Sequence, residues 1–218
     1  MKIIGMSTIE TSKVTRLDHL IGNAVQISIV SHTREDGDAV GSCIALMHYL
    51  SECRNCNVGI TFSDPVPDSI SFMIPEPDRN RIFIQSKDAT SATEWIKKSD
   101  LVFCLDCNSF SRADNLQDFY TESKAEKVLI DHHISPDSAE FDLVFSEINI
   151  SSTAELLFYI LLEMPEIDHD ASKLPIVTSN SLMAGMTTDT NNFANSTFPS
   201  TLNMASQLLS AGVNRDKI

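Results

Sequence analysis

The sequence predicts an α/β protein with a mostly parallel sheet and helices on both of its faces. Short β-branched runs alternate along the chain with segments of helical periodicity. The strand segments are apolar throughout, as expected for strands that are covered on both sides. The composition agrees, because 42% of the 218 residues are hydrophobic and 21% are charged, which excludes a disordered or low-complexity chain.

The expected elements follow one another in regular alternation. Strands are expected at residues 25–30, 58–62, 81–84, 101–105, 127–130 and, with the weakest pattern, 141–145. Helices are expected at residues 11–23, 38–52, 88–98, 152–164, 174–187 and 199–211. Ser152 and Glu155 form a capping-box pattern at the start of one helix, Pro165 ends it, and Gly212 ends the last one. The proline-rich segment 63–80 is expected to be a loop, with one short helix near Ile70.

The charge balance excludes several kinds of partner. Sixteen basic and thirty acidic residues give a net charge of −14, and the basic residues form no stripe. We therefore expect no binding of long duplex nucleic acid, and a phosphorylated partner would need metal ions to hold it. No run of 18 apolar residues occurs, so no membrane span is expected, and a cytoplasmic location is predicted.

The five cysteines include two Cys-x-x-Cys pairs, which are Cys53 with Cys56 and Cys104 with Cys107. Four such thiols can form a zinc site. The apolar surroundings of Cys104 and the long spacing between the pairs favour buried free thiols instead, and Cys43 fits a helix core.

Polar side chains capable of chemistry follow three strands directly. The first strand leads into His32, Asp36 and Asp38, the fourth into Asp106, and the fifth into residues 131–133. Because ligands bind beyond the carboxyl ends of parallel strands, these side chains are expected to converge at one edge of the sheet. Helix capping is the alternative for each of these aspartates, and it is a strong one for Asp36 and Asp38.

The stretch Asp131-His132-His133 is more specific than the isolated aspartates. Adjacent side chains after a strand point in different directions, so one imidazole can bind metal while the other faces substrate. Two polar loop residues are the alternative. Asp189 is expected at the end of a helix, where the helix dipole disfavours a carboxylate. A bound cation would remove this penalty. A solvated loop aspartate is the alternative.

Together these side chains can supply six ligands for two divalent ions, with a carboxylate as the bridge. They are His32, Asp36, Asp38, Asp106, His132 and Asp189. A mixed set of imidazoles and carboxylates favours Mn²⁺, although Mg²⁺, Co²⁺ and Fe²⁺ remain open.

Four stretches and one aspartate carry a family resemblance. They are HTREDGDAVGS (32–42), Asp106, VLIDHH (128–133), SSTAE (151–155) and GMTTDT (185–190). In this order, and over nearly the whole chain, they resemble the DHH phosphoesterases, with the nanoRNase and pAp phosphatase branch most similar. The resemblance implies a Rossmann-like domain and a two-manganese phosphoesterase. It would cut short oligoribonucleotides, or 3′-phosphoadenosine 5′-phosphate, to mononucleotides through a hydroxide that bridges the metals.

The family pattern also implies roles for single residues. The first ion would be held by His32, Asp36 and Asp106. The second would be held by Asp38, Asp106, His132 and Asp189. His133 would contact the scissile phosphate and Asp131 would orient the histidines. Arg112 would clamp the phosphate, with a surface arginine as the alternative.

Three departures from the family pattern concern substrate choice rather than the metals. They are Thr33-Arg34-Glu35 before Asp36, Asn191-Asn192-Phe193 after the TDT motif, and the lack of a basic residue in 194–197. The family pattern also implies that residues 1–213 are the catalytic domain, that 214–218 begin a linker, and that a DHHA1-type substrate domain is absent.

Two other functions stay open. One is a cyclic-dinucleotide or pyrophosphate hydrolase with the same metal site, and the other is a nucleotide-binding module without catalysis. The expected substrates are small phosphorylated nucleotides or short oligonucleotides, no membrane partner is expected, and a homodimer is left open.

Overall fold

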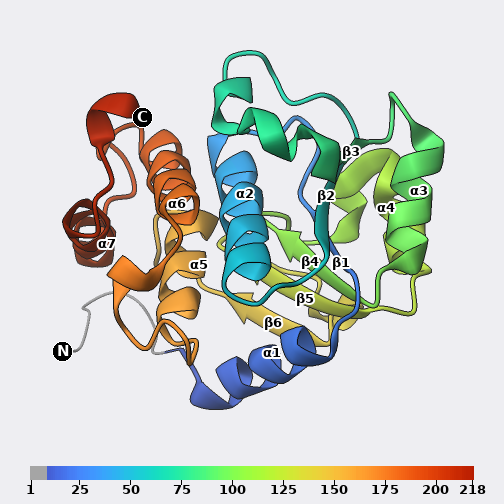
Figure 1. The fold of residues 1–218 in the computed structure, drawn as a ribbon, viewed down its shortest axis with the longest axis horizontal. Coiled ribbons are helices and arrows are strands. Elements are labelled where there is room, and N and C mark those ends of the chain that lie inside the picture. Colours follow the sequence, from blue (N-terminus) through green and yellow to red (C-terminus); the bar gives the residue numbers. More distant parts are fainter. Residues whose placement is uncertain (1–8) are drawn as a thin grey trace.

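The computed structural model describes residues 9–218 and confirms the α/β class (Figure 1). Six parallel strands form one sheet in the order β3-β2-β1-β4-β5-β6. The strands are β1 (Ile27–Val30), β2 (Val58–Phe62), β3 (Ile82–Ile84), β4 (Leu101–Leu105), β5 (Glu126–Asp131) and β6 (Leu143–Ser146). The winding reverses between β1 and β4, and ligands of such sheets bind at this reversal.

Helices cover both faces of the sheet (Figure 1). The α-helices are α1 (Thr11–Asn23), α2 (Gly37–Glu52), α3 (Ala89–Lys98), α4 (Gln117–Thr121), α5 (Thr153–Leu162), α6 (Ile176–Asp189) and α7 (Pro199–Ser210). The 3₁₀ helices are η1 (Ser71–Met73), η2 (Glu76–Arg81), η3 (Phe110–Leu116), η4 (Ser138–Glu140), η5 (Ala171–Lys173) and η6 (Arg215–Lys217). Within residues 9–218 no helix has the length and apolar character to cross a bilayer.

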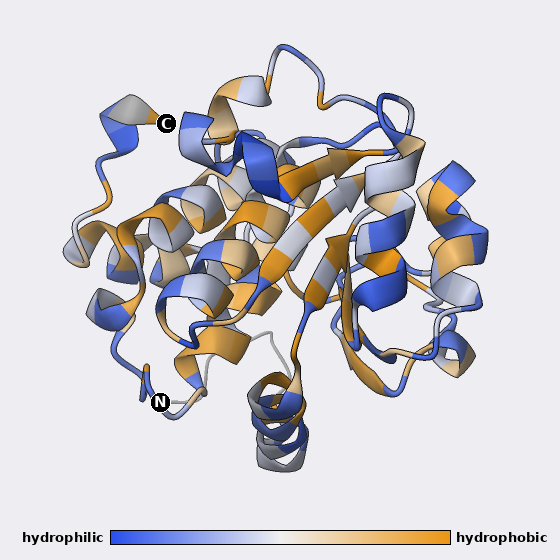
Figure 2. Ribbon diagram, turned by 45° about the vertical axis from the view of Figure 1, so that its right-hand side comes forward, coloured by the Kyte–Doolittle hydropathy of each residue, from blue (hydrophilic) through white to orange (hydrophobic). Residues whose placement is uncertain are grey.

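Two hydrophobic cores lie on opposite faces of the sheet, because alternate strand residues point to opposite sides. Ile27 and Ile29 of β1 face the larger core, which includes residues of α1, α2, α5, α6 and α7. Val30 faces the smaller core with residues of α3, η3 and α4. Figure 2 shows apolar colour concentrated on the strands, while the helices carry both apolar and hydrophilic colour.

The close contact between α2 and α6 depends on glycines. A Cβ atom on Gly41 would lie 2.6 Å from the carbonyl oxygen of Ser181, and one on Gly37 would lie 2.4 Å from Oγ1 of Thr188. The start of α2 therefore lies against the end of α6. This packing brings Asp38 and Asp189 into the same region.

Some boundaries differ from the sequence-based prediction. Strand β1 begins at Ile27 rather than at residue 25, because the backbone N–H groups of Val25 and Gln26 bond to the Asp100 carboxylate. The predicted loop 63–80 includes two 3₁₀ helices, η1 and most of η2, rather than one short helix. The segment formed by η3 and α4 was not predicted as helical.

The predicted helix cap at Ser152 is present, with a variation. Ser152 Oγ accepts a hydrogen bond of 3.0 Å from the backbone N–H of Glu155. The Glu155 carboxylate reaches back to the N–H of Ser151, at 3.0 Å, instead of that of Ser152. The residues at the start of α5 are thereby fixed in position next to the carboxyl edge of the sheet.

Candidate metal centre

The side chains predicted to converge do lie together at the carboxyl edge of the sheet. They come from the loop between β1 and α2, the first turn of α2, the residues that follow β4 and β5, and the last residue of α6. The strands β1 and β4 are the two between which the winding reverses. The position is therefore the one that the topology favours for a ligand.

Asp36 caps the start of α2, which is the alternative to metal binding that its sequence position suggests. Its Oδ1 accepts hydrogen bonds of 3.0 Å from the backbone N–H groups of both Asp38 and Ala39. A carboxylate oxygen of Asp36 also lies within 4.8 Å of ligand atoms of His32 and Asp106. Capping fixes this carboxylate at the site and does not remove it from the group.

Asp38 is buried and tied to the start of α5. Its Oδ2 accepts from the N–H of Thr153 at 2.7 Å, and its Oδ1 accepts from the N–H of Ala154 at 2.9 Å. Burial raises the pKa of Asp38, and the charges of Asp106 and Asp189 raise it further. Its carboxylate is thus held rigidly in a place where negative charge is disfavoured unless a cation is present.

Asp106 occupies the centre of the site at the end of β4, with a φ of 55°. Its Oδ2 lies 3.3 Å from Nε2 of His32, its Oδ1 lies 3.5 Å from Nε2 of His132, and Thr153 Oγ1 donates to Oδ1 at 2.9 Å. Burial disfavours its charge, but the hydrogen bond from His32 and the nearby histidines outweigh burial and lower its pKa. The carboxylate of Asp106 is therefore ionised and shared among several groups.

His32 carries the largest resolved shift among the site histidines. Burial opposes its protonation, but hydrogen bonds to Asp106 and to the Thr33 carbonyl, with the charges of Asp106 and Asp36, raise its pKa to about 9. Without a metal, His32 is held as an imidazolium that neutralises part of the carboxylate charge. A metal ion bound there would replace this proton.

The two histidines after β5 have different environments. Nε2 of His132 lies 4.0 Å from Asp38, 3.5 Å from Asp106 and 3.7 Å from Asp189. Nδ1 of His133 pairs with Oδ1 of the buried Asp131 at 2.8 Å, and this hydrogen bond raises the pKa of His133. His132 thus faces the carboxylates, while Asp131 orients the partly exposed His133.

Three groups of potential metal ligands result, each with its ligand atoms within 4.8 Å of one another. The groups are His32–Asp36–Asp106, Asp38–His132–Asp189 and Asp106–His132–His133. Asp106 and His132 each belong to two of them, so the groups are contiguous. The carboxylates raise one another's pKa. At Asp189, burial and the charges of Asp106 and Asp36 raise the pKa by more than His132 lowers it. This donor set fits divalent cations.

Arg112 lies in η3 beside the loop that carries His32. Its backbone carbonyl accepts a hydrogen bond of 2.9 Å from the N–H of Thr33. Its side chain is half-buried, and its charge opposes protonation of His133. The positive charge of Arg112 is therefore near enough to His133 to act on its protonation.

Sequence reasoning missed two features of the site. Glu35 is buried at 3% exposure, and neither of its carboxylate oxygens has a hydrogen-bond partner; burial raises its pKa. Arg215 lies 4.6 Å over the ring of Phe193 and donates to Asn192, so a distant basic residue reaches the loop after the TDT motif. No local pattern in the sequence identifies either contact.

Within residues 9–218, no cysteine belongs to these groups of ligands, although Cys107 directly follows Asp106. Cys43 and Cys104 are buried in the two cores, as their apolar surroundings predict, and all five cysteines are free thiols. Cys53 and Cys56 lie near the opposite end of α2 from Asp38. The two Cys-x-x-Cys pairs therefore do not contribute to the metal centre.

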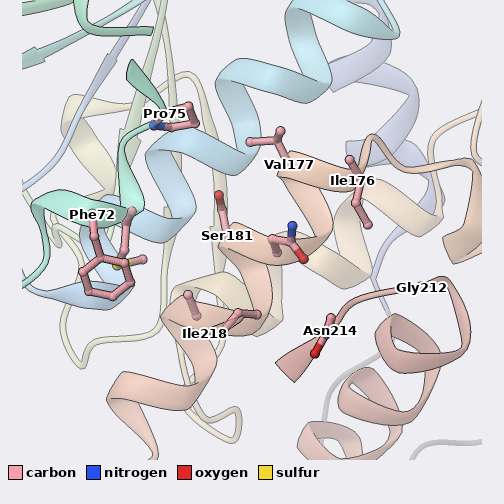
Figure 3. Close-up of a pocket in the computed structure, with 11 residues that line it drawn as sticks. Phe72, Pro75, Ile176, Val177, Ser181, Gly212, Asn214 and Ile218 are labelled. Atoms are coloured by element: carbon pink, nitrogen blue, oxygen red, sulfur yellow. The ribbon is translucent and has the colours of Figure 1, made fainter. Parts of the chain in front are cut away.

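A separate apolar cavity of about 350 Å³ lies along α6 (Figure 3). Phe72, Ile176, Val177 and Ile218 are among its lining residues. It contains none of the predicted metal ligands. The cavity and the metal centre are therefore distinct features on the same helix.

The fold and the centre together define the class of protein. Imidazoles and carboxylates at the reversal point of a doubly wound sheet are the ligands that a metal-dependent phosphoesterase uses. Residues 26–187 match the DHH family, N-terminal domain, and the chain belongs to this family. Membership agrees with the enzyme class that the sequence predicts.

Several known proteins are similar to the chain. It is 28% identical over 203 residues to the cyclic-di-AMP phosphodiesterase PdeA of Listeria monocytogenes, covering 91% of this chain and 30% of that protein. It is 27% identical over 195 residues to the uncharacterized protein MG371 of Mycoplasma genitalium, covering 88% of this chain and 54% of that protein. The chain therefore spans about a third to a half of these relatives.

Solved structures share the fold. An exopolyphosphatase-related protein from Bacteroides fragilis superposes with a TM-score of 0.87 at 28% identity, covering 97% of this chain and 60% of that chain. RecJ from Thermus thermophilus, solved in complex with Mn²⁺, has a TM-score of 0.55 at 15% identity, covering 96% of this chain and 27% of that chain. The RecJ likeness concerns the fold alone.

Proposed function

We propose that the chain is the catalytic domain of a two-metal, manganese-dependent phosphoesterase. Its proposed substrates are short oligoribonucleotides and 3′-phosphoadenosine 5′-phosphate, which it would hydrolyse to mononucleotides. The observation that carries the proposal is the position of Asp106, which lies within 3.7 Å of His32, His132 and His133 at the reversal point of the sheet. The net charge of −14 agrees with small substrates rather than long nucleic acid.

We assign His32, Asp36 and Asp106 to the first ion. The second ion would be held by Asp38, Asp106, His132 and Asp189, so Asp106 belongs to both sets. The distances among the ligand atoms support both sets. Asp106 lies within 4.8 Å of ligand atoms of His32 and Asp36, and His132 lies close both to Asp106 and to the Asp38–Asp189 pair. When bound, the divalent ions would supply an activated water and neutralise charge on the phosphoryl oxygens.

The remaining residues would bind and orient the substrate. His133, oriented by Asp131 at 2.8 Å and 36% exposed in its side chain, would donate a hydrogen bond to the phosphate. Arg112 would bind a phosphoryl oxygen through its guanidinium. Thr153 and the start of α5 would hold Asp38 and Asp106 in place during turnover.

A cyclic dinucleotide is the second proposed substrate class. The specific observation that favours it is the similarity to PdeA, a cyclic-di-AMP phosphodiesterase. The same metal centre would serve, because a cyclic dinucleotide also contains phosphodiester bonds. The choice between the classes depends on residues around the centre. A cytoplasmic location is proposed with either class.

The test is a substrate panel with and without metal. The 218-residue protein is incubated with Mn²⁺ and a dinucleotide, a pentaribonucleotide, 3′-phosphoadenosine 5′-phosphate or cyclic di-AMP, and products are separated by chromatography. We expect release of mononucleotide or phosphate, or of a linear dinucleotide from cyclic di-AMP, that EDTA abolishes and that Asp106→Ala reduces more than about a hundredfold. Asp68→Ala, at an exposed loop position, is the matched control. Turnover that survives both EDTA and Asp106→Ala would overturn the proposal.

A further inference from the structure

Glu35 has an unusual environment for a carboxylate. It lies in the loop between β1 and α2, between the exposed residues Arg34 and Asp36, yet it is 3% exposed. Arg34 has a φ of 58°, so the backbone turns sharply just before Glu35. The loop thereby directs one acidic side chain inward while both of its neighbours face solvent.

Neither carboxylate oxygen of Glu35 has a hydrogen-bond partner in the structure. Its own backbone N–H favours the charged form, but no hydrogen bond of normal geometry forms to either oxygen. Burying a carboxylate without a partner is strongly unfavourable, so native proteins compensate such groups. The hydrogen bonds of the structure therefore do not compensate a charge on Glu35, and burial raises its pKa.

The charged groups that face Glu35 do not supply it. They are His32, Asp36 and Asp64, and two of the three are acidic. His32 already has its Nε2 at 3.3 Å from Asp106 and its Nδ1 at 2.8 Å from the Thr33 carbonyl. No ion pair of Glu35 with a lysine or arginine is formed within residues 9–218.

The position of Glu35 relates it to the metal centre. His32 and Asp36, which interact with it electrostatically, are two of the three residues in one group of potential ligands. A divalent cation in that group would place a strong positive charge close to Glu35. One ion in this group would therefore serve both its ligands and the Glu35 carboxylate.

We propose that Glu35 is a positioning residue of the metal centre, whose buried carboxylate strengthens cation binding by the His32–Asp36–Asp106 group and is compensated by that cation. The inference rests on the proposed function and extends it to a residue that is not itself one of the assigned ligands. It also predicts opposite effects of Glu35 in the two states of the protein. The carboxylate weakens the metal-free fold and stabilises the metal-loaded one.

The test compares three variants of the 218-residue protein. Glu35→Gln removes the charge with little change of shape, Glu35→Asp keeps the charge, and Asp64→Asn removes one charge from an exposed neighbour. Mn²⁺ affinity is measured by titration calorimetry, and the unfolding temperature is measured in EDTA and in saturating Mn²⁺. We expect Glu35→Gln to weaken Mn²⁺ binding about tenfold while its metal-free unfolding temperature stays equal or rises. Asp64→Asn and Glu35→Asp should bind within about threefold of the original protein.

Each contrary result has a definite meaning. Wild-type affinity in Glu35→Gln would overturn the role of Glu35 and leave the proposed function intact. A Glu35→Gln protein that is unfolded or less stable in EDTA would also overturn it, because the carboxylate would then support the fold itself. Failure of the unmodified protein to bind Mn²⁺ would overturn the proposed function as well.

Discussion

Protonation of His32 offers a quantitative test of the site in the metal-free protein. The pKa of His32 is raised from 6.5 to about 9, because its contacts with Asp106, Thr33 and Asp36 outweigh its burial. A group with a raised pKa in the folded state stabilises the fold below its unfolded value and loses this contribution as pH rises through the folded value. The stabilisation by His32 is therefore complete below pH 6.5 and disappears by about pH 9.

The expected size follows from the same values. A pKa raised from 6.5 to about 9 corresponds to on the order of 3 kcal/mol, at about 1.4 kcal/mol for each tenfold change in proton affinity. His32 is only 6% exposed, so solvent screens little of this energy. The loss is measured as the difference in the free energy of unfolding between pH 6 and pH 9, from urea titrations in EDTA. The same difference for His32→Gln is subtracted, which isolates the contribution of His32.

Manganese should reverse the pH trend at this histidine. Because a metal ion competes with the His32 proton, Mn²⁺ affinity is expected to increase between pH 6.5 and about 9, where the metal-free fold loses stability. Parallel stability curves for the original protein and His32→Gln would refute the assigned ion pair. A stability gain in EDTA between these pH values would refute the direction of the shift.

Three further predictions concern packing, capping and substrate binding. Gly41→Ala should lower the free energy of unfolding by about 1–3 kcal/mol in urea titrations, because its Cβ would lie 2.6 Å from the Ser181 carbonyl oxygen. An unchanged urea midpoint would contradict the close approach of α2 and α6. Ser152→Ala should cost about 1 kcal/mol through loss of the cap at Glu155, against no loss expected for Ser210→Ala near the end of α7. Arg112→Ala should reduce substrate affinity at least about tenfold while calorimetric Mn²⁺ affinity stays unchanged, and loss of Mn²⁺ binding would instead indicate a structural role.

The convergence of the site was predictable because it depends on topology. In a parallel sheet, polar residues directly after apolar strands must meet at one edge. His32, Asp106 and His132 follow three strands in this way, and the structure brings them together. From sequence, helix capping and metal binding are alternatives for Asp36, whereas in the structure the same side chain caps α2 and belongs to a group of potential ligands.

Other features depend on contacts that no local pattern encodes. All residues from His32 to Asp36 are polar, so no periodicity indicates that Glu35 points inward. The segment from Phe110 to Thr121 combines a 3₁₀ helix, a residue with a φ of 49° at Asp114 and one short α-helix, which together give no regular apolar repeat. The hydrogen bonds from α5 to Asp38 require the packing of two helices that are distant in sequence.

The order of the site residues along the chain has a consequence for biosynthesis. The group His32–Asp36–Asp106 is complete once β4 has been translated and has paired with β1, whereas Asp38–His132–Asp189 requires α6 as well. Under the proposed assignment of two ions, the ligands of the first ion therefore leave the ribosome before those of the second are complete. Metal loading during synthesis should be stepwise, and arrest of translation between Asp106 and Asp189 should yield a nascent chain with one ion.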